Sequence, residues 1–145
     1  MAGYSAPLKD LEFLFGPFGL GGTLNGLSPY SDVSSEYLAP VFEEAGKFAS
    51  EVLAPINWSG DQQGSVIENG KVRTPDGWKE AYATFVEGGW CGLPFEEEIG
   101  GMALPWTVAI AVGEMWHASN LAWGLWPLLS LCIWADRQRA AQSGA

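Results

Sequence analysis

A chain of 145 residues is long enough for one domain with a moderate hydrophobic core. Its seventeen acidic residues outnumber its seven basic ones and give a net charge of −10, which excludes a nucleic-acid binder, because such a protein needs a basic surface. Eight tryptophans are more than a core of this size needs, so we expect several to face a partner or ligand, with a purely aromatic core as the alternative.

The first 33 residues predict an N-terminal arm. The start is polar and has no signal-peptide pattern, which favours a cytoplasmic protein. Apolar residues at Leu8, Leu11, Leu14 and Phe15 can share one face of a short helical segment. The glycines that follow, up to residue 25, predict irregular structure. So short a segment cannot bury its own aromatic side chains, and we expect it to lie on another surface.

The clearest amphipathic pattern predicts a helix over Tyr37–Leu53, with apolar residues at helical spacing and acidic residues on the outer face. Proline is tolerated in the first turn of a helix, so Pro40 leaves its start uncertain, and Pro55 is expected to end it. Beyond it, two short β-prone runs flank Asn69-Gly70, the pattern of a two-residue hairpin. We expect this hairpin to be an excursion from a helical domain, since an isolated hairpin is marginally stable.

Three more helices are predicted, over Trp78–Glu87, Pro105–Ala118 and Leu121–Arg137, with a glycine-rich turn between the first two. Pro127 is expected to kink the last one. The uncharged run over 118–135 approaches the roughly 18 residues that a membrane span needs, but Pro127 and several polar residues interrupt it. A buried protein helix is therefore favoured, and no membrane span is expected.

Together these elements predict an all-α fold, a small bundle of four to five helices with one β-hairpin excursion. The predicted organisation is an arm over residues 1–33, a helical domain over 34–131 and a divergent tail over 132–145.

Few residues offer catalytic chemistry. The acidic run Glu96-Glu97-Glu98 is expected to be solvated, and His117 stands alone, so no metal site is predicted. Glu114 is a lone carboxylate in an apolar helix, where burial would suit it to proton transfer, but an exposed edge of that helix or a hydrogen bond to nearby backbone is favoured. Cys91 and Cys132 are far apart and are interpreted as free structural thiols. No catalytic residue is predicted in this chain.

An ordered series of motifs over residues 4 to 130 nevertheless resembles the acyl-CoA dehydrogenase family, in particular larger bacterial members with an N-terminal arm. The motifs are Tyr4-x-Ala6-Pro7-Leu8-Lys9-Asp10, Phe48-Ala49-x-Glu51-Val52-Leu53-Ala54-Pro55, Gly77-Trp78-Lys79-Glu80-Ala81-Tyr82, Val86-Glu87-Gly88-Gly89-Trp90-x-Gly92-Leu93, Gly100-Gly101, Leu104-Pro105, Glu114-Met115 and Asn120-Leu121-Ala122-Trp123-Gly124-Leu125. Met102-Ala103 and the residues after about Leu131 depart from the family pattern.

The resemblance implies the N-terminal helical domain of an FAD enzyme that oxidises acyl-CoA to 2,3-enoyl-CoA. In that family FAD and the catalytic glutamate belong to a β-domain and to C-terminal helices. We therefore expect this chain alone to bind no FAD and to be inactive. It would be a truncated gene product, an excised domain or one part of a split enzyme. The N-terminal domain lines part of the acyl pocket, and its wall is expected here at Trp123, Leu125, Trp126 and Leu129. Acyl-CoA would bind only if the missing domains were supplied.

The alternative is a non-catalytic helical module that associates with itself or a companion chain through its apolar helices. The surface that the family buries between domains would then be free, and we expect a dimer or larger species. The expected patch is on the last helix and consists of Trp123, Trp126, Leu129, Ile133 and Trp134.

Overall fold

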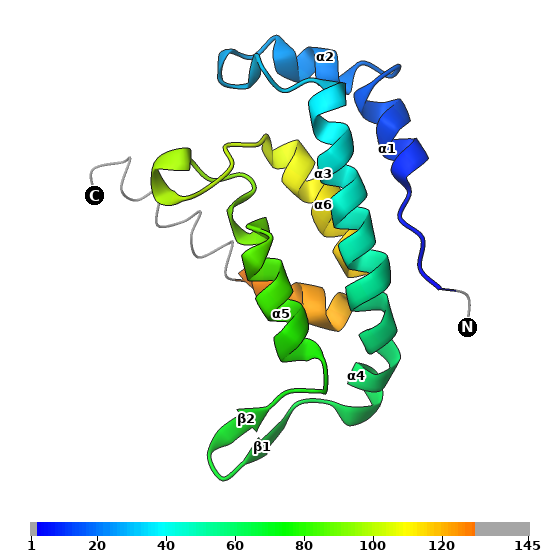
Figure 1. Cartoon of the computed structure of the whole chain (residues 1–145), viewed down its shortest axis with the longest axis vertical. Helices are drawn as coiled ribbons and strands as arrows, with labels where there is room; N and C mark the ends of the chain where they lie inside the picture. Colours follow the sequence, from blue (N-terminus) through cyan, green and yellow to red (C-terminus); the bar gives the residue numbers. More distant parts are fainter. Residues whose placement is uncertain (1–2, 130–145) are drawn as a thin grey trace.

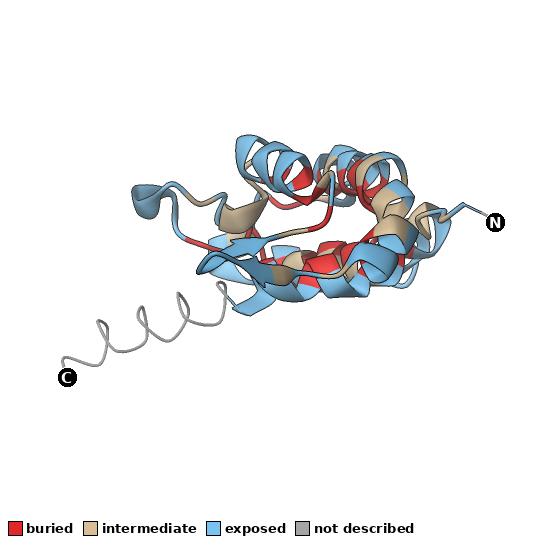
Figure 2. Cartoon of the chain, turned by 90° about the horizontal axis from the view of Figure 1, so that it is seen from below, coloured by how far each residue is buried: buried red, intermediate tan, exposed pale blue. Residues whose placement is uncertain are grey.

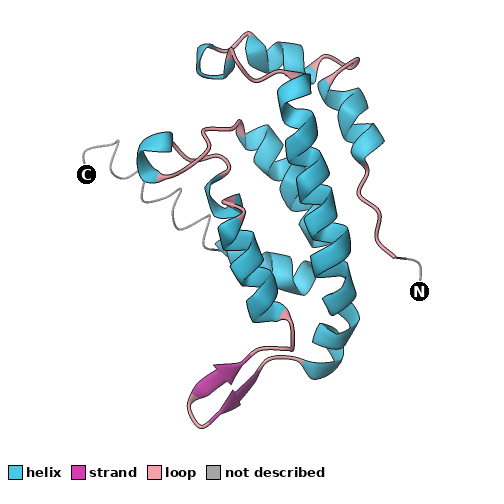
Figure 3. Cartoon of the chain, viewed as in Figure 1, coloured by secondary structure: helices cyan, strands magenta, loops and turns pink. Residues whose placement is uncertain are grey.

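The computed structural model describes residues 3–129 and has the predicted all-α fold with one hairpin (Figures 1 and 3). The parts of the expected last helix, the patch and the tail that lie beyond residue 129, including Cys132, Ile133 and Trp134, are outside the described residues. The elements are α1 (Leu8–Phe15), α2 (Leu20–Asn25), α3 (Ser35–Lys47), α4 (Asn57–Gln63), β1 (Val66–Glu68), β2 (Lys71–Arg73), α5 (Trp78–Glu87) and α6 (Trp106–Ser119). A further helical stretch covers 121–129 and is called the last helix below.

Helix α3 is the long element on which the rest is assembled. Its N-cap is Ser34, whose Oγ accepts a hydrogen bond of 3.1 Å from the backbone N–H of Tyr37, so the helix begins before the predicted start. The expectation that Pro40 lies in the first turn of the helix was therefore wrong, because this proline lies inside the helix. Pro40 is exposed, so its ring disturbs no core contact.

The prediction that Pro55 ends this helix was also wrong. After α3 the backbone continues as a π-helical segment, Phe48–Leu53, and a 3-10 turn, Ala54–Ile56, before α4 begins. In a regular α-helix the proline ring would meet the carbonyl four residues earlier, and the wider π-helical turn just before Pro55 changes that spacing. Helical backbone thus runs without interruption from Ser35 to Gln63.

The N-terminal arm lies against α3 (Figure 1). Leu11 and Phe15 on α1 are buried, and the Phe15 ring is 5.0 Å from that of Phe42 on α3. The expectation of irregular structure after α1 was wrong, because α2 forms there. Gly21 makes this possible, since a Cβ at that position would be 2.4 Å from the carbonyl oxygen of Phe15.

The core is formed by the inward faces of α3 with its π-helical extension, of α5 and of α6, and Figure 2 shows the buried stretches facing one another between the helices. Its centre is aromatic: the ring of Phe85 is 5.0 Å from that of Trp116 and 5.4 Å from that of Trp123, and both tryptophans also contact Phe48. These edge-to-face contacts bury large apolar rings, which is the main source of stability in a domain of this size.

The hairpin extends away from this core (Figure 1). It turns at Asn69 and Gly70, whose φ angles are 52° and 75°, as the two-residue turn requires. The register pairs Ile67 with Val72, and these side chains are 79% and 64% exposed. The predicted hairpin and its turn are confirmed.

Candidate functional site

An apolar hollow of about 360 Å³ lies where α5, the glycine-rich loop and the last helix meet. Pockets that bind small molecules usually have volumes of about 300 to 1,000 Å³, so this one is near the lower end. It is lined by Tyr82, Phe85 and Val86 of α5, by Gly89, Cys91, Gly92, Phe95, Ile99, Gly100 and Gly101 of the loop, and by Pro127 of the last helix.

The loop wall is closed by backbone hydrogen bonds between its two ends. The N–H of Met102 donates to the carbonyl of Gly92 at 2.9 Å, and that of Leu104 donates to the carbonyl of Leu93 at 2.9 Å. Gly101 is required by this closure, because a Cβ there would lie 2.1 Å from the carbonyl oxygen of Phe95. At its glycines the loop wall is backbone, and the side chains of Cys91, Phe95 and Ile99 form the rest of it.

The last helix is attached to the core through Asn120, whose side chain is 1% exposed. Its Oδ1 accepts the backbone N–H of Trp123 at 3.1 Å and so caps the first turn, while its Nδ2 donates to the carbonyl of Leu53 at 3.2 Å. One turn later Gly124 packs on His117, where a Cβ would be 3.0 Å from the imidazole Cδ2. The cap and the close approach fix the direction in which this helix leaves α6.

The four predicted acyl-wall residues differ in exposure because of how the last helix is placed. Trp123 is fully buried, with its ring 5.8 Å from that of Phe48 and its Nε1 donating to the carbonyl of Trp78 at 3.5 Å. The expectation that it belongs to an exposed patch is therefore wrong: the cap at Asn120 turns that side of the helix toward the core. Leu125, Trp126 and Leu129 are 46%, 44% and 64% exposed.

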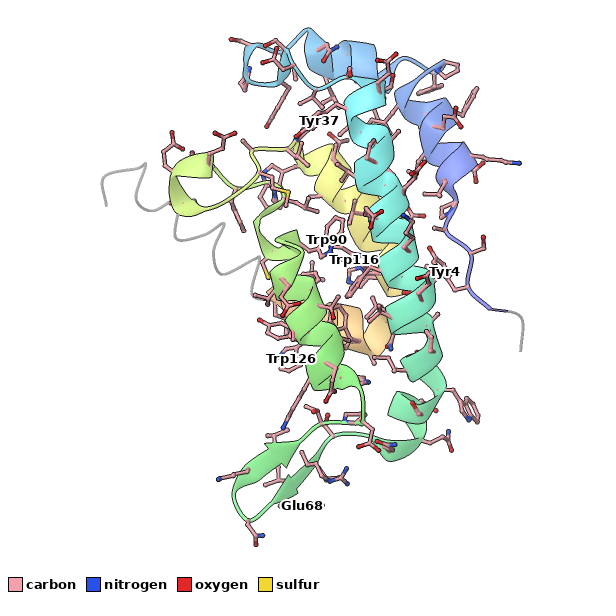
Figure 4. The ribbon with its side chains drawn as sticks, in the orientation of Figure 1. Tyr4, Tyr37, Glu68, Trp90, Trp116 and Trp126 are labelled. Atoms are coloured by element: carbon pink, nitrogen blue, oxygen red, sulfur yellow. The ribbon has the colours of Figure 1, made fainter. Side chains whose placement is uncertain are left out.

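Trp126 connects these exposed side chains to the hollow. Its ring stacks on that of Tyr82 with centroids 5.2 Å apart, and the next residue, Pro127, lines the hollow directly. Figure 4 shows Trp126 beside α5. The sequence predicted a helix over Trp78–Glu87 but assigned no site role to Tyr82 or Phe85; their helical spacing and aromatic character were the available signal for a lining role.

The titratable residues of the described chain do not assemble a catalytic group. Glu114 is exposed, as favoured from the sequence, and the side chains of Glu96, Glu97 and Glu98 are exposed as well. Cys91 lines the hollow, and burial raises the pKa of its thiol, which therefore stays protonated near neutral pH. Within residues 3–129 no three metal-ligating side chains gather at one place. The hollow as described is suited to apolar contact.

Among the helices that the structure describes, none combines the length and hydrophobicity needed to cross a bilayer.

Comparison with known proteins identifies relatives of this chain. No protein-family model matches it. The chain is 36% identical, over 127 residues or 88% of its length, to a 3-methylmercaptopropionyl-CoA dehydrogenase of Ruegeria pomeroyi. It is 27% identical, over 84% of its length, to a broad-specificity linear acyl-CoA dehydrogenase of Mycobacterium tuberculosis. The matches cover 22% and 20% of these curated relatives, so the chain spans about a fifth of their length. These relatives are acyl-CoA dehydrogenases, and the match is consistent with a domain of that family.

Proposed function

We propose that this chain supplies part of the acyl-pocket wall of an FAD-dependent enzyme that oxidises acyl-CoA to 2,3-enoyl-CoA, together with the other parts of such an enzyme. The observation that carries the proposal is the apolar hollow of about 360 Å³ with Trp126 stacked on Tyr82 beside it. Leu125 and Leu129 extend this apolar surface along the last helix.

An acyl chain is the ligand that such a surface favours. Each methylene removed from water contributes about 0.8 kcal/mol, and the rings of Tyr82 and Phe85 offer apolar surface against which it can be buried. In this proposal Leu125, Trp126 and Leu129 contact the ligand or a neighbouring domain, and buried Trp123 supports the helix that carries them. The catalytic base would come from the other parts of the enzyme, as the family resemblance implies.

FAD itself does not fit the described residues alone. Its pyrophosphate needs cations or a helix N-terminus, and none of the residues that line the hollow is basic. When bound in a complete enzyme, FAD would accept the hydride from the substrate. The part proposed for this chain is to bind and orient the acyl group and to exclude water from it.

A chimera tests this proposal. Residues 3–129 replace the matching segment of the Ruegeria enzyme, and Trp126→Ala is compared with Trp58→Ala, which removes a 59% exposed tryptophan from α4. If Trp126 lines the acyl pocket, its loss raises KM for acyl-CoA about tenfold, equivalent to ~1.4 kcal/mol, while Trp58→Ala leaves KM unchanged. An active chimera in which both substitutions leave KM unchanged would overturn the wall assignment.

Self-association is the second candidate function, and a separate observation favours it. Beyond the wall residues, Leu121 and Leu128 on the last helix are 58% and 39% exposed, and the sequence has no charged side chain from residue 115 to 135. Several hundred Å² of adjoining apolar surface favours pairing. The charge of −10 opposes it weakly, because repulsion is screened over about 8 Å at physiological salt.

Sedimentation at tens of micromolar shows whether the chain associates with itself. The unmodified chain should be a dimer or larger, and Leu125→Glu with Leu129→Glu should make it a monomer. Ile67→Glu with Val72→Glu changes the charge equally on the exposed hairpin and should leave the dimer intact. A monomeric unmodified chain would exclude this role.

A further inference from the structure

A second and larger hollow, a groove of about 660 Å³, lies on the other side of α5. Helix α5 turns Tyr82, Phe85 and Val86 to the first hollow and Thr84 and Glu87 to this groove. Figure 4 shows Trp90 above Trp116 between α5 and α3, where the groove runs. Its lining consists of Pro40, Val41, Glu44, Lys47, Phe48, Glu51, Val52, Thr84, Glu87, Gly88, Trp90 and Met102.

The floor of the groove is apolar and follows one face of a helix. Val41, Phe48 and Val52 are seven and four residues apart, which places them on the same side of α3 and its π-helical extension. From Val41 to Val52 the helix rises roughly 16 Å, about three turns, at 1.5 Å per residue. The half-buried ring of Trp90 closes the opposite side.

The walls restrict which kind of chain can lie there. They are formed mostly by α3, its extension and α5, whose backbone groups are used within the helices. No strand of the described residues lines the groove, so an extended peptide would find no sheet edge with which to pair. An occupant that crosses the apolar floor must satisfy its own backbone hydrogen bonds, and a helix does so.

The charges on the rim select the side chains of that helix. The carboxylates of Glu51 and Glu87 flank the groove without an ion pair, because the pairs within residues 3–129 are Lys47 with Glu44 and Arg73 with Glu68. The only cation of the rim is therefore already paired. A net charge of −10 on the chain further favours the approach of a cationic partner.

We propose that this groove binds a basic amphipathic helix of a partner protein, with apolar side chains on the floor and Lys or Arg beside Glu51 and Glu87. Within residues 3–129 a second copy of this chain offers no such helix, because each helix there carries at most one Lys or Arg. The proposal goes beyond the acyl-wall function and does not depend on it.

A model peptide tests the groove with the full 145-residue chain. The probe is a fluorescently labelled helical peptide of 14 residues with leucine on one face and arginine on the other, and binding is followed by anisotropy. A peptide with glutamate in place of arginine should not bind. Glu51→Gln with Glu87→Gln should weaken binding of the arginine peptide about tenfold, because two opposite charges lose their partners.

The matched control is Glu12→Gln with Glu98→Gln, which removes the same charge from exposed sites outside the groove and should change affinity less than twofold. Circular dichroism checks that all four substitutions leave the fold intact. Equal weakening by both double variants would show unspecific attraction to an acidic protein and would overturn the proposal. The proposal would also fail if the arginine peptide did not bind at about 100 µM, a concentration at which a weak complex would still form. It would fail as well if Glu51→Gln with Glu87→Gln strengthened self-association instead.

Discussion

Removing the side chain of Asn120 should destabilise this domain more than the loss of an ordinary helix cap. Asn120→Ala removes the acceptor for the Trp123 N–H and the donor to the Leu53 carbonyl, both in a site that is 1% exposed. A lost N-cap costs about 1 kcal/mol, and a buried polar group left without its partner costs about 1–3 kcal/mol. We therefore expect a loss of about 2–4 kcal/mol in the free energy of unfolding.

Ser34→Ala provides the matched control. Ser34 caps α3 through one hydrogen bond of 3.1 Å at an exposed site, so its loss should cost only the capping contribution of about 1 kcal/mol. Asn120→Asp keeps the acceptor for the Trp123 N–H and removes the donor to the Leu53 carbonyl. Its free energy of unfolding should lie between those of the wild type and Asn120→Ala only if the bond to Leu53 contributes less than the cap. Urea unfolding followed by circular dichroism and tryptophan fluorescence measures all three variants.

Asn120→Ala should also change the tryptophan fluorescence of the folded protein. Because Asn120 fixes the helix that inserts Trp123 into the core, its loss should also shift tryptophan emission to longer wavelength before global unfolding. The account of the last helix would be refuted if Asn120→Ala cost no more than Ser34→Ala and left the emission spectrum unchanged.

Three shorter predictions follow. Gly101→Ala should destabilise the fold by several kcal/mol, because its Cβ would lie 2.1 Å from a carbonyl oxygen. Gly22→Ala, with open space around the new Cβ in α2, should stabilise it by up to about 1 kcal/mol. Thermal melts compare the two variants. Burial raises the pKa of Cys91 and of Tyr4, so the folded state holds these protons longer than the unfolded state. Stability should then fall as the pH rises above about 9, and Cys91→Ala with Tyr4→Phe should flatten that fall in urea titrations at pH 8 to 11. Finally, the purified chain should carry no flavin. A stoichiometric absorbance band at about 450 nm, where bound flavin absorbs, would contradict this.

Local sequence signals predicted the elements whose two faces differ in polarity or whose turn needs special residues. Helix α5 has the bounds that its apolar spacing and the following glycines indicated. The hairpin turns at Asn69 and Gly70 because those residues adopt positive φ at low cost. In both cases the determining interactions lie within a few residues of chain.

The π-helical segment before Pro55 makes a contact that no local pattern contains. The carbonyl of Leu53 meets the side chain of Asn120, which is 67 residues away in sequence. A proline normally predicts the end of a helix, and here the chain instead continues through a widened turn whose carbonyl has a buried donor from another element. The local rule for proline takes account of neither the widened turn nor this distant donor.

The candidate site was predictable in its location and not in the direction of its side chains. Trp123 and Trp126 are three residues apart, close to one helical turn, yet one is fully buried and the other is 44% exposed. Amphipathic helices reveal their buried face through the polar face opposite it, and the last helix has no charged residue to mark an outer face. What orients it is the pair of contacts made by Asn120 and Gly124 with the π-helical segment and with His117. Beyond these contacts and the stacking of Trp126 on Tyr82, the last helix leaves Leu125 and Leu129 exposed, and this is why the acyl-wall and self-association proposals both rest on those two residues.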